Sequence, residues 1–187
     1  MKKTSTIIIG LVVILGAVIL WGVSTYNSLV TLSEKVDTEY SNISVVLERR
    51  ADLIPNLVNT VKGYASHEET VINNITDARQ NLLNANNVAE KAEANSKLTD
   101  AINALMVVVE NYPDLKANTN FINLQDELAG TENRIATARR DYNNAVKEYN
   151  TKIKKMPTNI IANFTNFDKK AYFEVSKEKT EVPNVEF

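Results

Sequence analysis

The spacing of the apolar residues limits the fold of this chain more than any other feature. From Leu29 to Ile153 they recur three or four positions apart almost throughout, which puts them on one face of each helix. Such persistence predicts helices that pack at shallow angles, as in bundles and coiled coils. Only five Gly and four Pro interrupt the 187 residues, so the elements can be long. The four predicted faces are Leu29, Leu32, Val36, Tyr40, Ile43 and Leu47; Leu57, Val61, Tyr64, Val71, Ile75, Ala78 and Leu82; Leu98, Ile102, Leu105, Val109 and Tyr112; and Phe121, Leu124, Leu128, Ile135, Ala138, Tyr142, Ala145, Tyr149 and Ile153.

The first predicted break between helices lies near a proline. Asp52 suits an N-cap, and Pro55 would then fall in the first turn, where its missing N–H costs nothing. The preceding helix should therefore end near Arg50 or Ala51.

Three further breaks follow from turn-forming residues. They are an Asn-rich stretch from Asn84 to Val88, the run Tyr112-Pro113-Asp114 before a cap at Asn118 or Thr119, and Met156-Pro157. Short connections join antiparallel neighbours. The sequence thus predicts an all-α fold, with an elongated antiparallel four-helix bundle of up-down-up-down order over residues 26–156.

The periodic pattern stops at residue 157. Residues 157–187 carry Ile160, Ile161, Phe164 and Phe167 among polar residues, which makes this segment too apolar for a solvated tail and too irregular for another helix. We expect an irregular C-terminal tail that packs back on the bundle, lies on the membrane surface, or presents a partner site.

A membrane anchor is predicted at residues 6–25, after a short basic N-terminus at residues 1–5. No charged residue occurs between Lys3 and Glu34, and an apolar run extends from Ile7 to Val23. With its flanks this run reaches the roughly 20 residues that a membrane-spanning helix needs. A cleaved signal peptide is the alternative, although the run exceeds the usual signal core. Membrane-spanning positions include Ile7, Leu11, Leu15, Val18 and Trp21.

The orientation of the anchor is predicted from Lys2 and Lys3, the basic residues closest to the apolar run. The positive-inside rule places the N-terminus in the cytoplasm and the bundle outside it, on a cell (inner) membrane. In an up-down bundle the last helix returns to the membrane, so Lys152, Lys154 and Lys155 are candidate contacts for lipid headgroups. The alternative is that these lysines only complement the helix dipole.

Several classes of function are disfavoured by composition. The chain has no Cys and a single histidine, His67, so a protein-built zinc or di-iron site is not expected. We find no phosphate-binding loop and no nucleophile elbow. A formal net charge of −2 is unlike that of nucleic-acid binders. We therefore predict no enzymatic activity, no cofactor, no metal, no small-molecule substrate and no nucleic-acid partner.

One charged position falls on an apolar face. Arg50 lies three residues past Leu47, so it should be partly buried and needs an ionic partner. Asp52 and Glu48 are the nearest carboxylates. An ion pair at the end of a helix is the favoured interpretation, and a partner site is the alternative.

Longer motifs resemble the LemA family of bacterial membrane proteins. They are Tyr26-Asn-Ser-Leu-Val, Glu48-Arg-Arg-Ala-Asp-Leu-Ile-Pro-Asn-Leu-Val, Val61-Lys-Gly-Tyr-Ala, His67-Glu, Glu110-Asn-Tyr-Pro-Asp-Leu-Lys-Ala-Asn, Phe121-Ile-Asn-Leu-Gln-Asp-Glu-Leu, Thr131-Glu-Asn-Arg-Ile, Ala138-Arg-Arg-Asp-Tyr-Asn, Tyr149-Asn and Met156-Pro-Thr-Asn. The resemblance covers nearly the whole chain in the right order.

The resemblance implies a short N-terminal anchor, a long antiparallel helical bundle and no established enzymatic activity. Proteins of this family are often encountered beside membrane zinc proteases, and a relative belongs to the membrane organelles of magnetic bacteria. The leading expectation is a membrane-anchored scaffold or adaptor of the bacterial envelope that binds protein partners or copies of itself. The alternative is a regulatory subunit of a membrane zinc metalloprotease.

Two stretches of the family signature are expected to meet. In an up-down bundle, a turn at Arg49–Asn56 and a turn at Tyr112–Asn118 would share the membrane-distal end. We predict a polar partner surface there, formed by Arg49, Arg50, Asp52, Asn56, Asp114, Lys116 and Asn118. The alternative is that these residues serve only the turns.

Overall fold

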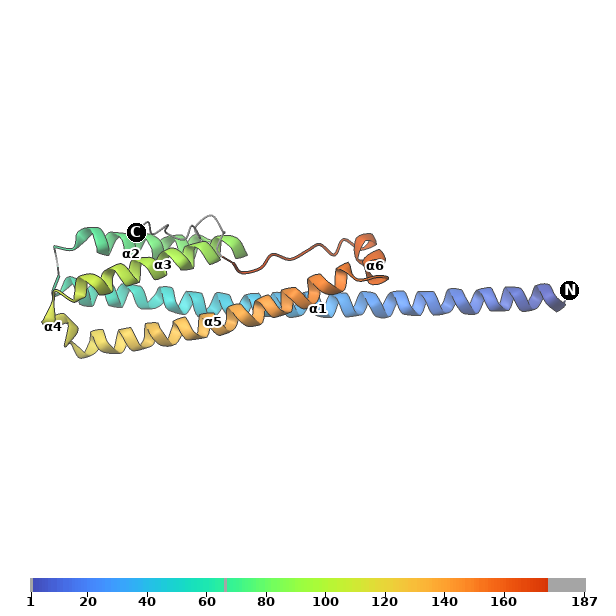
Figure 1. The fold of residues 1–187 in the computed structure, drawn as a ribbon, viewed down its shortest axis with the longest axis horizontal. Coiled ribbons are helices and arrows are strands. Elements are labelled where there is room, and N and C mark those ends of the chain that lie inside the picture. Colours follow the sequence, from blue (N-terminus) through green and yellow to red (C-terminus); the bar gives the residue numbers. More distant parts are fainter. Residues whose placement is uncertain (1, 66, 175–187) are drawn as a thin grey trace, which may run out of the picture. The chain divides into compact units, whose positions relative to one another are not determined.

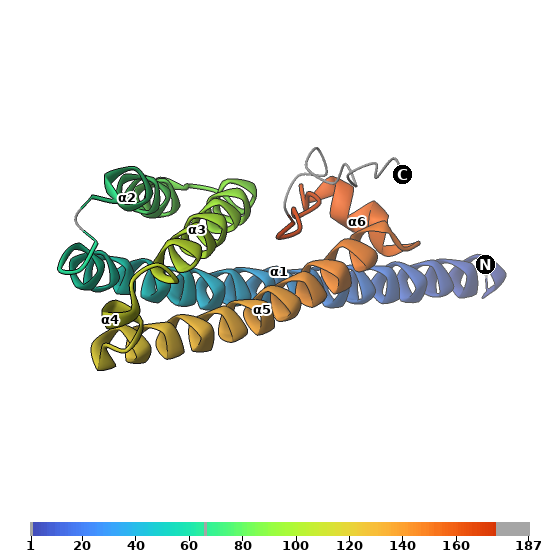
Figure 2. The same ribbon diagram turned by 60° about the vertical axis from the view of Figure 1, so that its left-hand side comes forward.

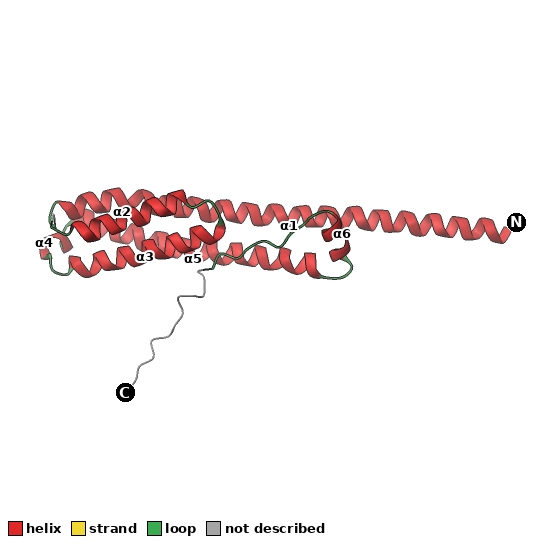
Figure 3. Ribbon diagram, turned by 90° about the horizontal axis from the view of Figure 1, so that it is seen from above, coloured by secondary structure: helices red, strands yellow, loops and turns green. Residues whose placement is uncertain are grey.

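The computed structural model describes residues 2–65 and 67–174, with side chains from residue 7 onward. The described residues form helices joined by turns, without a strand (Figure 3). Six helices follow in order: α1 (Lys2–Lys62), α2 (Glu69–Asn84), α3 (Val88–Val109), α4 (Pro113–Lys116), α5 (Thr119–Lys154) and α6 (Thr158–Phe164) (Figure 1). The prediction of an all-α fold with a long apolar N-terminal helix is confirmed, while the four-helix order stays a prediction.

Residues group into two compact units. The anchor unit contains the chain up to Thr38 together with Asn144–Lys170. The bundle unit contains Glu39–Asn143 and, of the described residues, 171–174. α1 and α5 each contribute residues to both units.

The core of the bundle unit follows the predicted apolar spacing. α2 and α3 pack side by side there (Figure 2). The fully or almost fully buried apolar side chains include Ile43, Leu47, Ile54, Leu57, Val61, Ile75, Leu98, Leu105, Phe121, Leu128, Ile135 and Tyr142. Tyr64 departs from the prediction, because it lies in the turn after α1 and is exposed.

The predicted break at Pro55 is wrong. α1 continues through Pro55 to Lys62, and Asp52 is an exposed residue of this helix rather than its cap. Pro55 has no N–H, so the Ala51 carbonyl four residues earlier loses its donor within the helix. The Nε of Arg79, on α2, donates to that carbonyl oxygen at 2.8 Å. A side chain from a neighbouring helix thus replaces the bond that proline removes.

The other predicted breaks are confirmed. α2 ends at Asn84, and the Asn87 side chain caps α3 by accepting from the backbone N–H of Glu90 at 2.9 Å. The Asn118 side chain caps α5, accepting from the N–H groups of Asn120 and Phe121 at 2.9 and 3.1 Å. α5 then ends at Lys154, before Met156-Pro157.

Residues beyond Pro157 are partly helical, which corrects the expectation of a tail too irregular for a helix. Thr158–Phe164 form α6, because Thr158 and Ala162, four residues apart, bury the same face. Residues 165–174 are not helical, and those beyond 174 lie outside the described part of the chain.

The non-helical segment is held by two Tyr-Asn dipeptides of α5. In the anchor unit, the side-chain amide of Asn150 accepts from the Lys170 N–H at 3.0 Å and donates to its carbonyl at 2.9 Å, while the Tyr149 hydroxyl donates to the Asp168 carbonyl at 2.9 Å. In the bundle unit, Asn143 binds the N–H and carbonyl of Phe173 in the same way, at 2.8 and 3.3 Å. The Tyr142 hydroxyl donates to the Ala171 carbonyl at 2.8 Å. The hydrogen bonds of each dipeptide therefore go to backbone atoms of the segment.

Candidate functional site

A buried arginine lies at the centre of the bundle unit. Arg50 of α1 is 3% exposed, and its Nη1 donates to Asn95 Oδ1 at 2.8 Å and to Thr99 Oγ1 at 3.0 Å, both on α3. The same nitrogen lies 2.7 Å from Glu132 Oε2 on α5. Arg50 thereby joins three helices of one unit.

Burial lowers the pKa of Arg50, and the facing Glu132 carboxylate partly opposes that shift. The guanidinium stays charged at neutral pH, because an arginine pKa starts far above it. A buried charge is tolerated only when it is paired and hydrogen-bonded. In the Arg50 cluster (Arg50, Asn95, Thr99 and Glu132) the Nη1 atom meets both conditions, while the buried Nε of Arg50 has no hydrogen-bond partner. The cluster therefore serves to hold α1, α3 and α5 together.

The predicted partners of Arg50 are wrong. Glu48 and Asp52 are both exposed. Each is two residues from Arg50, and residues two apart on a helix do not face each other. The actual partners come from α3 and α5. Arg49 is exposed and forms a surface ion pair with Glu127 at 3.2 Å.

A groove of about 430 Å³ runs beside the Arg50 cluster in the bundle unit. Its walls are largely apolar, with Ile102 and Met106 from α3 and Leu128 and Ala129 from α5. Gln125 crosses the groove, since its Nε2 lies 3.1 Å from the Met106 sulfur. Among the residues that line this groove, no nucleophilic side chain is hydrogen-bonded to a general base.

The turns at one end of the bundle unit are joined by hydrogen bonds between polar side chains. The Tyr112 hydroxyl donates to Glu68 Oε1 at 2.8 Å, and Asn118 Nδ2 donates to the Tyr64 hydroxyl at 2.9 Å. The hydrogen bond to Glu68 is the main cause that raises the pKa of Tyr112. We call Tyr64, Glu68, Tyr112 and Asn118 the end-turn cluster.

The structure corrects which stretches meet at this end. Arg49, Arg50, Asp52 and Asn56 all lie inside α1, because the helix does not turn at Pro55. The residues that contact Tyr112 and Asn118 are instead Glu68 and Tyr64, which belong to the same family signature. Asp114 and Lys116 lie exposed on α4, where Lys116 pairs with Glu110 at 2.6 Å. His67 is exposed in the neighbouring turn.

The predicted lipid-facing positions belong to the anchor unit. Ile7, Leu11, Leu15, Val18 and Trp21 are all exposed on α1, Leu15 by 62%. This helix is the single one among those described that is long and apolar enough to cross a membrane. So large an exposed apolar surface is unstable in water.

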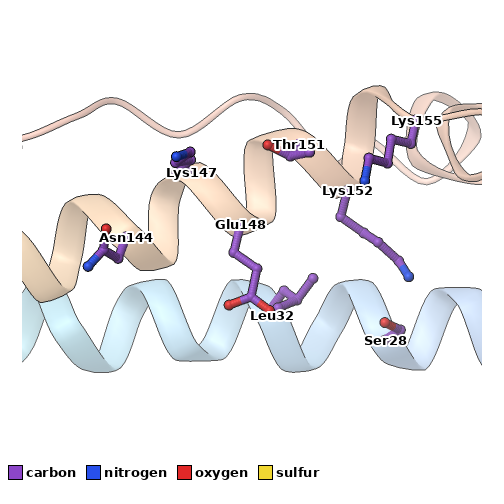
Figure 4. A pocket seen from close by; sticks show the side chains of 8 residues that line it. All are labelled: Ser28, Leu32, Asn144, Lys147, Glu148, Thr151, Lys152 and Lys155. Carbon is purple, nitrogen blue, oxygen red and sulfur yellow. The ribbon is translucent and has the colours of Figure 1, made fainter.

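A second groove of about 430 Å³ lies between α1 and α5 in the anchor unit (Figure 4). Its lining includes the predicted headgroup contacts Lys152 and Lys155, with Ser28 opposite. Lys152 extends toward Ser28, and Glu148 points toward Leu32. Lys154 is exposed and does not line the groove.

No cluster of three metal-ligating side chains occurs within residues 7–65 and 67–174. Arg50 and Arg79 each bind groups on neighbouring helices, and both serve the fold. Sequence reasoning missed Arg79, Glu132 and the pair of Tyr-Asn dipeptides. A signal for the dipeptides was present, because they repeat at a seven-residue interval.

Comparison with known proteins gives a consistent result. The sequence profile of the LemA family matches residues 39–187, beginning at the first residue of the bundle unit. "Magnetosome protein MamQ 2" of Paramagnetospirillum magneticum is 28% identical over 175 residues, covering 80% of this chain and 64% of that protein. "Magnetosome protein MamQ" of Magnetospirillum gryphiswaldense is 26% identical, covering 79% and 64%. "Protein LemA" of Metamycoplasma hominis is 25% identical over 162 residues, covering 86% of this chain and 74% of its own. The chain thus spans a little under two thirds of the MamQ proteins.

Proposed function

Since the chain belongs to the LemA family, we propose that it is a non-enzymatic scaffold or adaptor of the bacterial envelope, anchored in the membrane by α1. The observation that carries this proposal is that one helix holds both an exposed apolar run and the core positions of a helical bundle. α1 exposes Ile7 to Val23 and then buries Ile43, Leu47 and Ile54. Such a helix would tether a folded domain to a membrane.

Chemistry within the bundle unit supports a binding role rather than catalysis. The buried charge of Arg50 is bound by three partners, which is what a stable helical surface needs. Relatives named as magnetosome proteins fit a protein that works with others at a membrane structure. Lys2 and Lys3 favour a cytoplasmic N-terminus in the inner membrane, with the bundle outside the cytoplasm.

The partner surface is proposed at the end-turn cluster and the adjoining exposed residues Asp114 and Lys116. Polar turns with defined hydrogen bonds present donors and acceptors in fixed positions, which favours specific recognition. Arg49, Asp52 and Asn56 are exposed on α1 and could extend this surface along the helix.

In-cell crosslinking followed by tagged purification tests this proposal. The full chain should capture envelope proteins or its own copies, and a chain starting at Ser24 should capture fewer. Lys116→Glu should weaken capture without lowering the melting temperature, because its exposed ion pair with Glu110 adds at most about 1 kcal/mol.

Lys97→Glu is the matched control, since Lys97 also forms an exposed ion pair in the bundle unit, with Glu93 at 2.8 Å. It should leave capture unchanged. If Lys116→Glu lowers the melting temperature and leaves capture intact, the end turns serve the fold alone. If the full chain captures nothing beyond background, the scaffold proposal fails.

A further inference from the structure

α6 and Met156, two residues before it, expose an unusual amount of apolar surface. Phe164 is 88% exposed, Met156 74% and Ile160 58%. Ile160 and Phe164 are four residues apart, so they share one face of α6. Phe164 is more exposed than Leu20, which at 73% is the most exposed large side chain of the apolar run. A surface of this kind calls for an apolar environment.

α6 lies beside α1 within the anchor unit (Figure 1). Ile161 Cδ1 lies 3.9 Å from the position where a Cβ on Gly22 would stand. Just beyond α6, the Phe167 ring packs edge-on against Tyr26 with centroids 5.7 Å apart. α6 is therefore fixed beside the stretch Gly22–Tyr26.

That stretch marks the end of the anchor. The apolar run ends at Val23, and Trp21 and Tyr26 are residue types that favour the boundary between lipid tails and headgroups. At 1.5 Å per residue, Gly22 and Tyr26 are about 6 Å apart along the helix, close to the thickness of one headgroup layer. α6 thus lies at the depth where interfacial helices insert their apolar faces.

Positive charge adjoins the same place. Lys152 and Lys154 lie in the last turn of α5, and Lys155 follows it before α6 begins. Lys152 and Lys155 line the groove in Figure 4. Glu148, which also lines this groove, is ion-paired with Lys35 at 2.8 Å. These lysines place positive charge where phosphate groups of anionic lipids would be favourable partners.

We propose that α6 is a second membrane contact: Met156, Ile160 and Phe164 insert into the interfacial layer of the membrane that α1 crosses, and Lys152, Lys154 and Lys155 bind anionic headgroups. This inference rests on the proposed anchoring by α1. It goes beyond that proposal because the anchor alone requires no lipid contact after residue 26.

The absence of cysteine makes the test direct, since single cysteines can carry a spin label without background. The variants are Ile160→Cys and Phe164→Cys in α6, with Leu15→Cys in the anchor as the positive control. Val107→Cys is the matched aqueous control, because Val107 is apolar and 71% exposed but lies on α3. The full chain is reconstituted in vesicles of equal parts phosphatidylcholine and phosphatidylglycerol, and accessibility to oxygen and to a water-soluble nickel complex is measured.

Labels at Ile160 and Phe164 should be accessible to oxygen and protected from nickel, as at Leu15, whereas Val107 should be accessible to nickel. Nickel access at both α6 positions, with Leu15 protected, overturns the inference and leaves the anchor in place. Nickel access at Leu15 overturns the proposed anchoring itself. Protection of the α6 labels from both reagents also overturns the inference, because a protein partner or second copy then covers the face.

The lysines are tested in the Phe164→Cys chain by changing all three to Glu. Nickel access at Phe164 should rise on vesicles with phosphatidylglycerol and stay unchanged on phosphatidylcholine alone. Lys62→Glu, in the bundle unit, is the control and should have no effect. An equal response on both lipids would overturn the role of anionic headgroups.

Discussion

At the scale of single residues, the Arg50 cluster contains an asymmetry that can be measured. Arg50 is almost fully buried, whereas Glu132, its ionic partner, keeps about half of its side chain exposed, at 48%. Loss of Arg50 leaves a carboxylate that water can reach, but loss of Glu132 leaves a cation that water cannot reach.

We therefore predict that Glu132→Ala destabilises the chain more than Arg50→Met does. Removing the partner of a buried charge costs about 3 kcal/mol, and replacing that charge with an apolar side chain of similar length costs about 1 kcal/mol or less. Urea unfolding of the full chain in detergent measures both. Glu127→Ala removes the exposed pair with Arg49 and should change the free energy of unfolding by under about 1 kcal/mol. Equal losses for Glu132→Ala and Arg50→Met would contradict the argument.

At the scale of elements, the continuity of α1 depends on a contact between helices. Proline in a helix interior costs about 3 kcal/mol, partly because one carbonyl loses its donor. The Arg79 side chain satisfies that carbonyl, on Ala51, from α2.

A double-mutant cycle tests this compensation. Arg79→Met alone should cost about 1 to 2 kcal/mol, because it leaves the Ala51 carbonyl without a donor. In a Pro55→Ala chain the restored N–H of residue 55 supplies the donor, so Arg79→Met should cost only a few tenths of a kcal/mol. Urea unfolding of the four chains gives the coupling. Additive effects would mean that Arg79 does not compensate for the proline.

The Tyr-Asn dipeptides of α5 lead to a paired prediction. Asn150→Ala should speed hydrogen exchange at the Lys170 amide, which donates to Asn150, and leave the Phe173 amide unchanged. Asn143→Ala should do the reverse, since the Phe173 amide donates to Asn143. Asn144→Ala is the control, because Asn144 is exposed beside them and should affect neither amide. Exchange that rises at both amides in either variant would indicate one cooperative unit instead.

Elements differ in how far the sequence alone predicts them. Periodicity predicted the helices, and cap residues such as Asn118 predicted their boundaries, because both signals are local. The break at Pro55 was wrong because the proline rule is local too, whereas Arg79 comes from another helix. The partners of Arg50 were missed for the same reason, since Asn95 and Glu132 lie far along the chain. The non-helical path of residues 165–174 depends on bonds to backbone atoms, which leave no pattern in the segment itself.

At the scale of the whole molecule, buried tyrosines couple stability to alkaline pH. Burial is the main cause that raises the pKa of both Tyr149 and Tyr40, and the nearby Asp168 and Asp37 add to the shift at Tyr149. The folded chain therefore favours the protonated phenols more than the unfolded chain does.

The free energy of unfolding should receive the full contribution of these tyrosines below the ordinary tyrosine pKa of 10.0. It should fall as the pH rises above that value, because the unfolded chain then releases protons first. Urea unfolding across this range should show a smaller fall for the Tyr40→Phe, Tyr149→Phe double variant. Parallel curves for the two chains would show that other groups cause the alkaline loss.

The spacing of the two Tyr-Asn dipeptides along α5 matches the spacing of their targets along the segment that they bind. Asn143 and Asn150 are seven residues apart on a helix, a rise of about 10.5 Å, and their targets Phe173 and Lys170 are three residues apart on an extended chain, a span of about 10 Å. The tyrosines show the same spacing. Tyr142 and Tyr149 are seven residues apart on the helix, and their acceptors, Ala171 and Asp168, are three residues apart. The two distances are nearly equal. If a single residue were inserted between Lys170 and Phe173, one dipeptide could keep its hydrogen bonds only if the other lost them. The length of this segment is consequently constrained, in addition to the burial of its Phe173 side chain.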